Sequence, residues 1–249
     1  MSRPAPALRS AAALAAMELK LTSRRGENVL VTLVIPVAVL LFFATVGIVP
    51  GIAGPAVDFL LPGALALGII ASGLVNLGIA TAYERSYGVL KRLGGSPLPR
   101  SGLIAAKIAS ILVLEVVQVA LLVAVAALVL GWRPATGTSP GLAVVAVLLG
   151  TFAFAGLGLL MAGTLSAEAA LALANGLFLG FLMLGGIVLP LDHLPAALEV
   201  VARLLPASAL ADLFRVALSG TGEIGGPIVV LVAWGLAAVG LSIRSFRWE

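Results

Sequence analysis

Long stretches of Val, Leu, Ile, Ala and Gly run along this chain and are separated by short polar segments. Six of these apolar stretches are long enough to cross a hydrocarbon layer of about 30 Å as a helix. Their residues do not alternate between apolar and polar, as the strands of a membrane β-barrel would. The pattern therefore predicts one all-α integral membrane domain over residues 1–249, with six transmembrane helices at 29–48, 58–81, 102–130, 141–164, 169–189 and 225–243.

The segments outside these stretches predict shorter elements. Within residues 1–28, Leu14, Met17 and Leu21 recur at helical spacing beside basic residues, which predicts an amphipathic interfacial helix over 7–25. Residues 190–224 are too polar to span and are interrupted by prolines. They predict one or two short helices lying at the outer surface or dipping into it. The domain divides into six segments: 1–28, 29–81 (two spans), 82–101, 102–189 (three spans), 190–224 and 225–249 (the sixth span and a tail).

Composition agrees with a membrane protein and sets its orientation. Of 249 residues, 61% are hydrophobic and 10% are charged, whereas a soluble domain carries about 25% charged residues. Twelve of the 15 Lys and Arg residues flank one side of the predicted spans, against Arg133, Arg203 and Arg215 on the other. The positive-inside rule then places both termini and residues 82–101 in the cytoplasm. This topology accounts for the net charge of +4, and no nucleic-acid partner is needed.

Several chemistries are excluded by residue type. The chain has no cysteine and one histidine, His193, so disulfides, thiol chemistry and a His cluster for metal are ruled out. The first 28 residues are long and basic, which does not fit a cleavable signal peptide. The chain has no Gly-x-x-x-x-Gly-Lys-Ser/Thr phosphate loop. We therefore expect no ATP hydrolysis by this chain itself.

The polar link at 84–100 reads ERSYGVLKRLGGSPLPR. Tyr87, Leu90 and Leu93 recur at helical spacing, which predicts a short amphipathic helix of about two to three turns, and Gly94-Gly95 can end it. Two interpretations follow from the residues. The link is either a solvated loop that fixes topology, or a docking element for a cytoplasmic partner, joined to two spans so that force on it moves both.

A few polar and aromatic residues lie inside the predicted spans. Glu115 and Gln118 share one face of the third span, and such groups are functional candidates because ionisable residues are costly in a membrane. Three interpretations of Glu115 stay open: it is a structural carboxylate, a group that contacts substrate, or a proton-binding site. Asn76 and Asn175 either form hydrogen bonds between helices or contact substrate. Phe152 and Phe178 either pack against protein or lipid or line a substrate path. The candidate path comprises Asn76, Glu115, Gln118, Phe152, Asn175 and Phe178.

Gly176 and Gly180 form a small-x-x-x-small pair in the fifth predicted span. Such a pair permits close helix approach. It suits a seam between two subunits and equally suits packing within one subunit.

The sequence also resembles the type-2 ABC transporter permeases, the membrane subunits of bacterial exporters related to the daunorubicin-resistance permeases. The resemblance covers nearly the whole chain. It rests on Pro36 in the first span, Pro62-Gly63 in the second, the segment ERSYGVLKRLGGSPLPRSGLIAAK, and GGIVLPLDHLPAALEVVARLLPASALADLFR. The last segment supplies an outer-face motif of Pro190, Pro195, Pro206 and Arg215. Gly94-Gly95 departs from the family, whose members often carry bulkier residues there.

The resemblance implies a coupling helix in the link, docked on an ATPase subunit. Its residues would be Glu84, Arg85, Tyr87, Gly88, Leu90, Lys91, Arg92 and Leu93. It implies two ATPase subunits, with ATP and magnesium bound by them, and a second permease copy, either identical or similar. The expected cargo is hydrophobic or amphipathic, such as a drug, an antibiotic or a lipid-like molecule. The expected location is the bacterial cytoplasmic membrane, in contact with lipid.

Two other function classes are weighed against this one. A secondary transporter or channel is typically built of repeated halves with broken helices, and no convincing internal repeat is seen. An intramembrane protease needs a Gly-x-Ser-Gly serine with a membrane histidine, or His-Glu-x-x-His. The stretch at 68–73, GIIASG, does not provide the first, and the chain does not contain the second.

Overall fold

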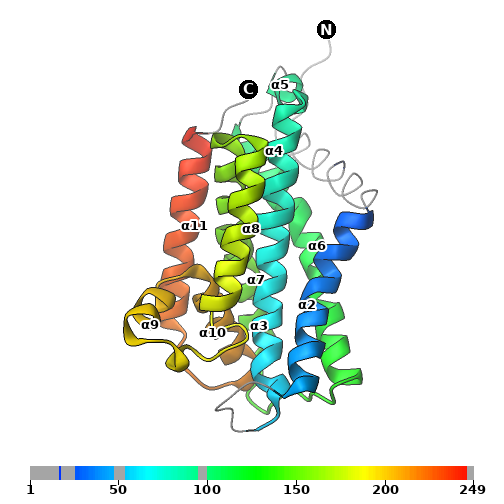
Figure 1. Ribbon diagram of the computed structural model, residues 1–249, viewed down its shortest axis with the longest axis vertical. Helices are drawn as coiled ribbons and strands as arrows, with labels where there is room; N and C mark the ends of the chain where they lie inside the picture. Colours follow the sequence, from blue (N-terminus) through cyan, green and yellow to red (C-terminus); the bar gives the residue numbers. More distant parts are fainter. Residues whose placement is uncertain (1–16, 18–25, 48–53, 95–99, 246–249) are drawn as a thin grey trace.

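The fold is known from a computed structural model that describes residue 17 and residues 26–47, 54–94 and 100–245 (Figure 1). Every regular element in these ranges is helical, which confirms the predicted all-α class. The rest of the predicted interfacial helix at 7–25 and the tail at 246–249 lie outside the described residues, as do 48–53 and 95–99.

Long apolar helices form the body of the molecule. The chain between Ala56 and Ser86 is one continuous helix made of α3 (Ala56–Ile70), the π-helical turn η1 (Ala71–Leu77) and α4 (Gly78–Ser86). The other long helices are α6 (Arg100–Leu128), α7 (Pro140–Thr164), α8 (Ala167–Leu184) and α11 (Gly225–Ser245). These five are long and apolar enough to cross a membrane.

The first helix of the body is α2 (Gly26–Val46), whose apolar stretch with described side chains runs from Thr32 to Val46. That stretch is shorter than a full crossing, so the first predicted span, and with it the number of six spans, stays a prediction. Two predicted ends differ from the structure by five residues. The second span is predicted to end at 81, but its helix continues to Ser86; the fifth is predicted to reach 189, but its helix ends at Leu184.

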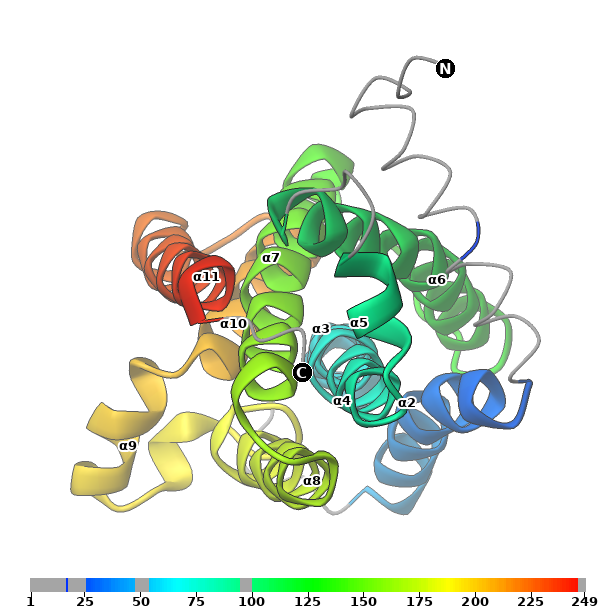
Figure 2. The same cartoon turned by 90° about the horizontal axis from the view of Figure 1, so that it is seen from above.

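The helix formed by α3, η1 and α4 is the central element of the bundle (Figure 2). It packs against α2, α6, α7, α8 and α10, and 89% of its most apolar stretch is buried. In α6, α8 and α11 the corresponding share is 22–28%, since these helices have only one side against the rest of the chain. The central helix therefore touches most of the other elements and can transmit movement among them.

Glycines allow α7 to lie directly against the central helix. A Cβ atom added at Gly158 would come within 2.5 Å of the carbonyl oxygen of Gly73, and one added at Gly78 within 2.9 Å of the Cα atom of Gly158. A Cβ atom at Gly63 would overlap the carbonyl oxygen of Ile187. The glycine of the family-like Pro62-Gly63 pair is thus needed for close backbone approach.

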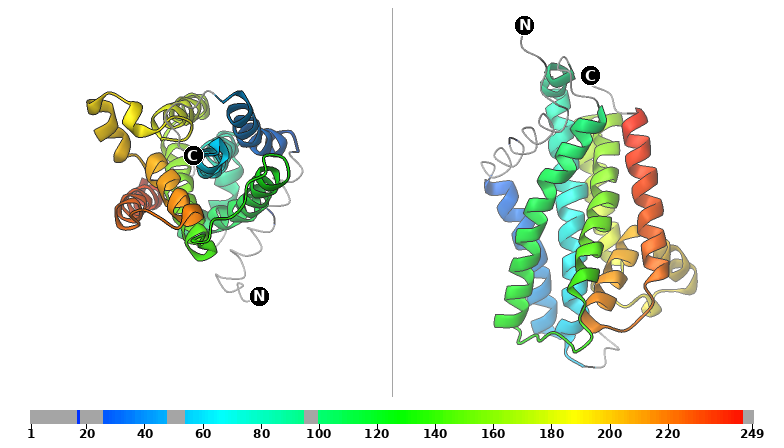
Figure 3. Two further views of the ribbon diagram at one scale, coloured as in Figure 1. Left: turned by 90° about the horizontal axis from the view of Figure 1, so that it is seen from below. Right: turned by 180° about the vertical axis from the view of Figure 1, so that it is seen from behind.

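Between α8 and α11 the chain forms η2 (Leu191–His193), α9 (Ala196–Arg203) and α10 (Pro206–Ser219). Pro195 directly precedes α9, and Pro206 is the first residue of α10, a position where a proline loses no backbone hydrogen bond. The two helices differ in how they pack, while their placement at or in the membrane surface stays a prediction. Helix α10 is buried against α3, α7 and α11, whereas α9 lies at the side of the bundle (Figures 1 and 3).

Candidate functional site

The candidate site is the turn between α4 and α5 (Val89–Gly94), at the end of the bundle where α11 also finishes (Figure 1). The helix that includes α4 ends at Ser86, and Gly88 has a φ of +72°, a backbone angle that favours glycine. The predicted amphipathic helix is therefore shorter than expected, because Glu84 and Arg85 belong to the last turn of α4.

The side chains of this segment point in different directions. Leu90 is fully buried, whereas Tyr87 is 76% exposed and Lys91 is exposed. The side chains of Arg92 and Leu93 lie outside the described residues, although their backbone belongs to α5. The buried leucine anchors the short helix, and the exposed residues leave a surface on which a partner could dock.

Glu84 forms an ion pair with Lys107 of α6. The Lys107 Nζ atom lies 2.7 Å from the Glu84 Oε2 atom, Lys107 is fully buried, and the Glu84 side chain is 12% exposed. A buried charge is stable only when it is paired and hydrogen-bonded. This pair therefore ties the end of the second spanning helix to the beginning of the third, on either side of the candidate coupling segment.

Arg85 forms a second link, to the connection between α7 and α8. Its guanidinium donates a hydrogen bond to the carbonyl oxygen of Leu165, the residue that follows α7. Ser166 then caps α8, since its hydroxyl oxygen accepts a hydrogen bond of 3.2 Å from the backbone N–H of Ala169. The α4 end is thus connected to two further spanning helices.

A shallow hollow of about 380 Å³ opens between these segments. Arg85, Ser86, Gly88 and Lys91 line one side, and residues 166–168 line the other, with Glu168 as the acidic member. Cationic and anionic groups therefore face the same space. Such a surface can recognise a protein partner that carries complementary charges.

Deeper in the bundle, Gln118 joins three helices by hydrogen bonds. Its amide nitrogen donates to the carbonyl oxygen of Thr32 in α2 at 2.9 Å, and its amide oxygen accepts from the hydroxyl of Ser72 in η1 at 2.9 Å. Gln118 is 1% exposed and also packs against Gly68. Its amide therefore has partners within the subunit, as is usual for polar groups between membrane helices.

Glu115 lies one turn before Gln118 and is fully buried. One of its carboxyl oxygens is hydrogen-bonded to the hydroxyl of Thr151 in α7. The same hydroxyl oxygen lies 2.6 Å from the carbonyl oxygen of Val147, so it bridges the carboxyl group and the α7 backbone. Asn76, in η1, is partly buried. These polar groups lie between helices of one chain.

The remaining residues of the candidate path lie on other surfaces. Phe152 faces α11, where a Cβ atom on Gly235 would collide with its ring. Asn175 is exposed on α8, and Phe178 is partly buried there. Phe152 and Asn175 thus do not face the space around Glu115 and Gln118. The assignment of these six residues to a substrate path stays a prediction.

The outer-face motif organises the opposite end of the bundle. Pro190 precedes η2, while Pro195 and Pro206 precede and open α9 and α10. Arg215 donates a hydrogen bond of 2.6 Å to Asp212, three residues earlier on α10, and a second bond to the carbonyl oxygen of Gly186. Arg215 therefore holds α10 to the turn that follows α8.

Sequence reasoning missed two parts of the arrangement around the α4–α5 turn. It treated Lys107 only as a charge that sets topology, although a lysine two turns inside an apolar helix needs a buried partner. It also gave no signal that Arg85 would bind the carbonyl oxygen of Leu165. The partner of Lys107 could have been found by looking for an acidic residue at the end of the neighbouring span, where Glu84 lies.

Comparison with known proteins agrees with this architecture. The chain is 30% identical over 171 residues to the "Putative transport permease ycf38" of Porphyra purpurea. The alignment covers 68% of this chain and 58% of that protein, so the chain spans less than two thirds of its relative's length. The family described as ABC-2 type transporter matches residues 10–219. The structure agrees with this match, because it is a helical membrane bundle whose link between the second and third spans is tied to its neighbours. The chain therefore belongs to the ABC-2 type transporter family of membrane subunits.

Proposed function

We propose that this chain is the permease of an ATP-driven exporter and that the α4–α5 turn receives movement from an ABC ATPase subunit. The observation that carries the proposal is the pair of links at this turn. Glu84 binds Lys107 of α6, and Arg85 binds the residue that follows α7. A partner that moves α5 would therefore pull on the central helix, α6 and the α7–α8 connection together.

The partner is recognised by charge and shape. The hollow beside α5 presents Arg85 and Lys91 on one side and Glu168 on the other. Family membership implies an ABC ATPase as the partner. In our proposal two ATPase subunits bind ATP and magnesium, and their closure on ATP moves the α4–α5 turns of two permease copies.

A second permease copy would complete the path. In α8, a Cβ atom added at Gly176 or Gly180 would meet no described atom within 4 Å. The small-x-x-x-small pair therefore does not serve packing among the described residues of one subunit. This favours the first of its two interpretations, a seam against a second copy, because small residues let two helices approach closely.

The cargo and the location follow from the same arrangement. The exposed faces of the spanning helices are apolar, with Val116, Leu179 and Leu236 among the exposed residues. We propose a hydrophobic or amphipathic cargo, such as a drug, an antibiotic or a lipid-like compound. We place the protein in a bacterial cytoplasmic membrane, with the α4–α5 turn and both termini in the cytoplasm.

The test is purification of the tagged protein from its native membrane in mild detergent, followed by identification of co-purifying proteins and an assay of ATP hydrolysis. We expect a stoichiometric ATPase subunit and measurable activity. Recovery of the protein alone and inactive under several mild conditions would contradict the proposal and favour a self-sufficient transporter or channel.

A variant tests the role of the turn directly. Reversing charge with Arg85→Glu and Arg92→Glu should separate ATP hydrolysis from export while the protein still inserts and dimerises. Arg133→Glu, an exposed arginine of the α6–α7 connection at the opposite end, is the matched control. Normal export by the Arg85 and Arg92 variant would show that the turn does not couple the two activities.

A further inference from the structure

A second hollow, of about 430 Å³, lies at the other end of the bundle, between α10 and the first turns of α11. Its charged lining residues are Arg203, Asp212, Arg215 and Glu223, and its apolar wall includes Val216 and Val230. Two guanidinium groups and two carboxylates therefore surround one space. This hollow plays no part in the proposed coupling to an ATPase.

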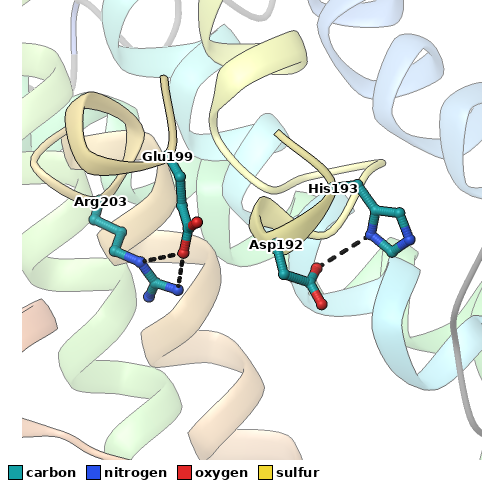
Figure 4. Close-up of polar contacts among 4 residues, drawn as sticks. All are labelled: Asp192, His193, Glu199 and Arg203. Atoms are coloured by element: carbon teal, nitrogen blue, oxygen red, sulfur yellow. Dashed lines mark hydrogen bonds and ion pairs between the residues drawn. The ribbon is translucent and has the colours of Figure 1, made fainter. Parts of the chain in front are cut away.

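The charges around this hollow are paired and held in place. Arg203 donates two hydrogen bonds, of 3.0 and 2.7 Å, to Oε1 of Glu199 (Figure 4), and these bonds raise the pKa of Arg203. The guanidinium of Arg215 lies 4.3 Å from the centre of the Phe59 ring and is bonded to Asp212. Each guanidinium therefore has a carboxylate partner on its own helix, and the charges of the four lining residues sum to zero.

The acidic side of the hollow is fixed at the start of α11. The Oε1 atom of Glu223 accepts a hydrogen bond of 3.3 Å from the backbone N–H of Gly226. Gly226 and Pro227 belong to the first turn of a helix of 21 residues, which is about 31 Å long and matches the hydrocarbon thickness. In a bilayer crossed by α11, this first turn lies at the depth of the lipid headgroups.

Exposed apolar side chains belong to α9 and α11, the same two helices that supply part of the lining. Val200 and Leu204 of α9 and Val229 of α11 are each more than 60% exposed. The indole N–H of Trp234 donates a 3.0 Å hydrogen bond to the carbonyl oxygen of Leu204, which holds the end of α9 against α11. The hollow thus has a charged part and an adjoining apolar surface.

We propose that this hollow binds the zwitterionic headgroup of a phospholipid, with phosphate toward Arg203 and ammonium toward Glu223. A planar guanidinium suits phosphate oxygens, and a carboxylate suits a primary ammonium group. The balanced lining disfavours a purely anionic group. The exposed apolar residues of α9 and α11 would contact the acyl chains. The ligand class is therefore a phosphoethanolamine lipid of the outer leaflet.

The test is native mass spectrometry of the detergent-purified protein after titration with phosphatidylethanolamine or phosphatidylglycerol. We expect one retained phosphatidylethanolamine per chain and about a tenfold preference for it, since one charge-assisted contact is worth about that factor. Glu223→Gln keeps an acceptor at the start of α11 but removes the carboxylate that would face the ammonium, so the preference for phosphatidylethanolamine should fall about tenfold.

The controls separate this site from nonspecific lipid binding. Arg203→Gln should lower retention of phosphatidylethanolamine about tenfold, whereas Arg133→Gln, an equal change of charge at the same end, should leave it unchanged. Equal retention of the two lipids by the unaltered protein would overturn the proposal, as would equal effects of the two arginine variants. Soluble phosphoethanolamine should compete poorly; full displacement of the lipid by it at equal concentration would also refute a lipid ligand.

Discussion

The contact between α7 and the central helix leads to a quantitative prediction about Gly158. An alanine there would place its Cβ atom 2.5 Å from the carbonyl oxygen of Gly73, 3.1 Å from that of Leu74 and 3.2 Å from the Cα atom of Gly78. All three are backbone atoms of η1 and α4. No side chain can rotate away to make room, so α7 must move from the central helix.

The magnitude follows from a matched comparison with Gly240. Replacing a helical glycine by alanine stabilises a helix by up to about 1 kcal/mol, and overpacking a tightly packed contact costs about 1–3 kcal/mol. Gly240 lies in α11, where an added Cβ atom would meet no described atom within 4 Å. The helix-propensity gain is common to both variants. Gly158→Ala should therefore be less stable than Gly240→Ala by the overpacking cost alone, about 1–3 kcal/mol.

The assay is reversible denaturation of each purified variant in the same detergent. Unfolding is monitored as the loss of the helical circular dichroism signal. We expect Gly240→Ala to equal or exceed the stability of the unaltered protein. We expect Gly158→Ala to unfold at a lower denaturant concentration. Equal stability of the two variants would refute the reasoning, because it would mean that α7 does not lie in backbone contact with η1.

Three further predictions concern the polar contacts and the open face of α8. A double-mutant cycle with Glu84→Gln and Lys107→Met should give a favourable coupling energy of about 1 kcal/mol or more, and additive effects would show that the ion pair adds no stability. Gln118→Leu should lower the free energy of unfolding by about 1–3 kcal/mol because Ser72 loses its buried acceptor, and an unchanged unfolding midpoint would contradict the observed bond. Gly176→Leu should reduce the crosslinked dimer fraction without lowering monomer stability, whereas an unaltered fraction would place the seam elsewhere.

The membrane class, the approximate spans and the family could be predicted from the sequence, because each depends on local information. A helix in lipid satisfies its own backbone hydrogen bonds, so an apolar stretch of sufficient length is enough to predict it. The position of the segment from Pro206 to Ser219 was harder to predict from the sequence. Its composition is intermediate, and only its packing against α3, α7 and α11 shows that it dips into the bundle.

Hydrophobicity did not reveal which helix would be central. The helix from Ala56 to Ser86 is less hydrophobic than α6, yet it is the more buried of the two. Lipid tails and protein interiors are similarly apolar, so hydrophobicity alone does not separate a lipid-facing helix from a buried one. The glycines at positions 73, 78 and 158 could be read from the sequence, but their meeting across two helices could not.

The candidate site shows the same division between local and long-range information. The sequence by itself determined the basic, glycine-containing link between the second and third spans, because the residue types are contiguous there. Only the tertiary structure decided that Glu84 would meet Lys107 and that Arg85 would reach the residue after α7. The physical reason is that these partners are separated by 23 and 80 residues along the chain, and only the packing of whole helices brings them within hydrogen-bonding distance.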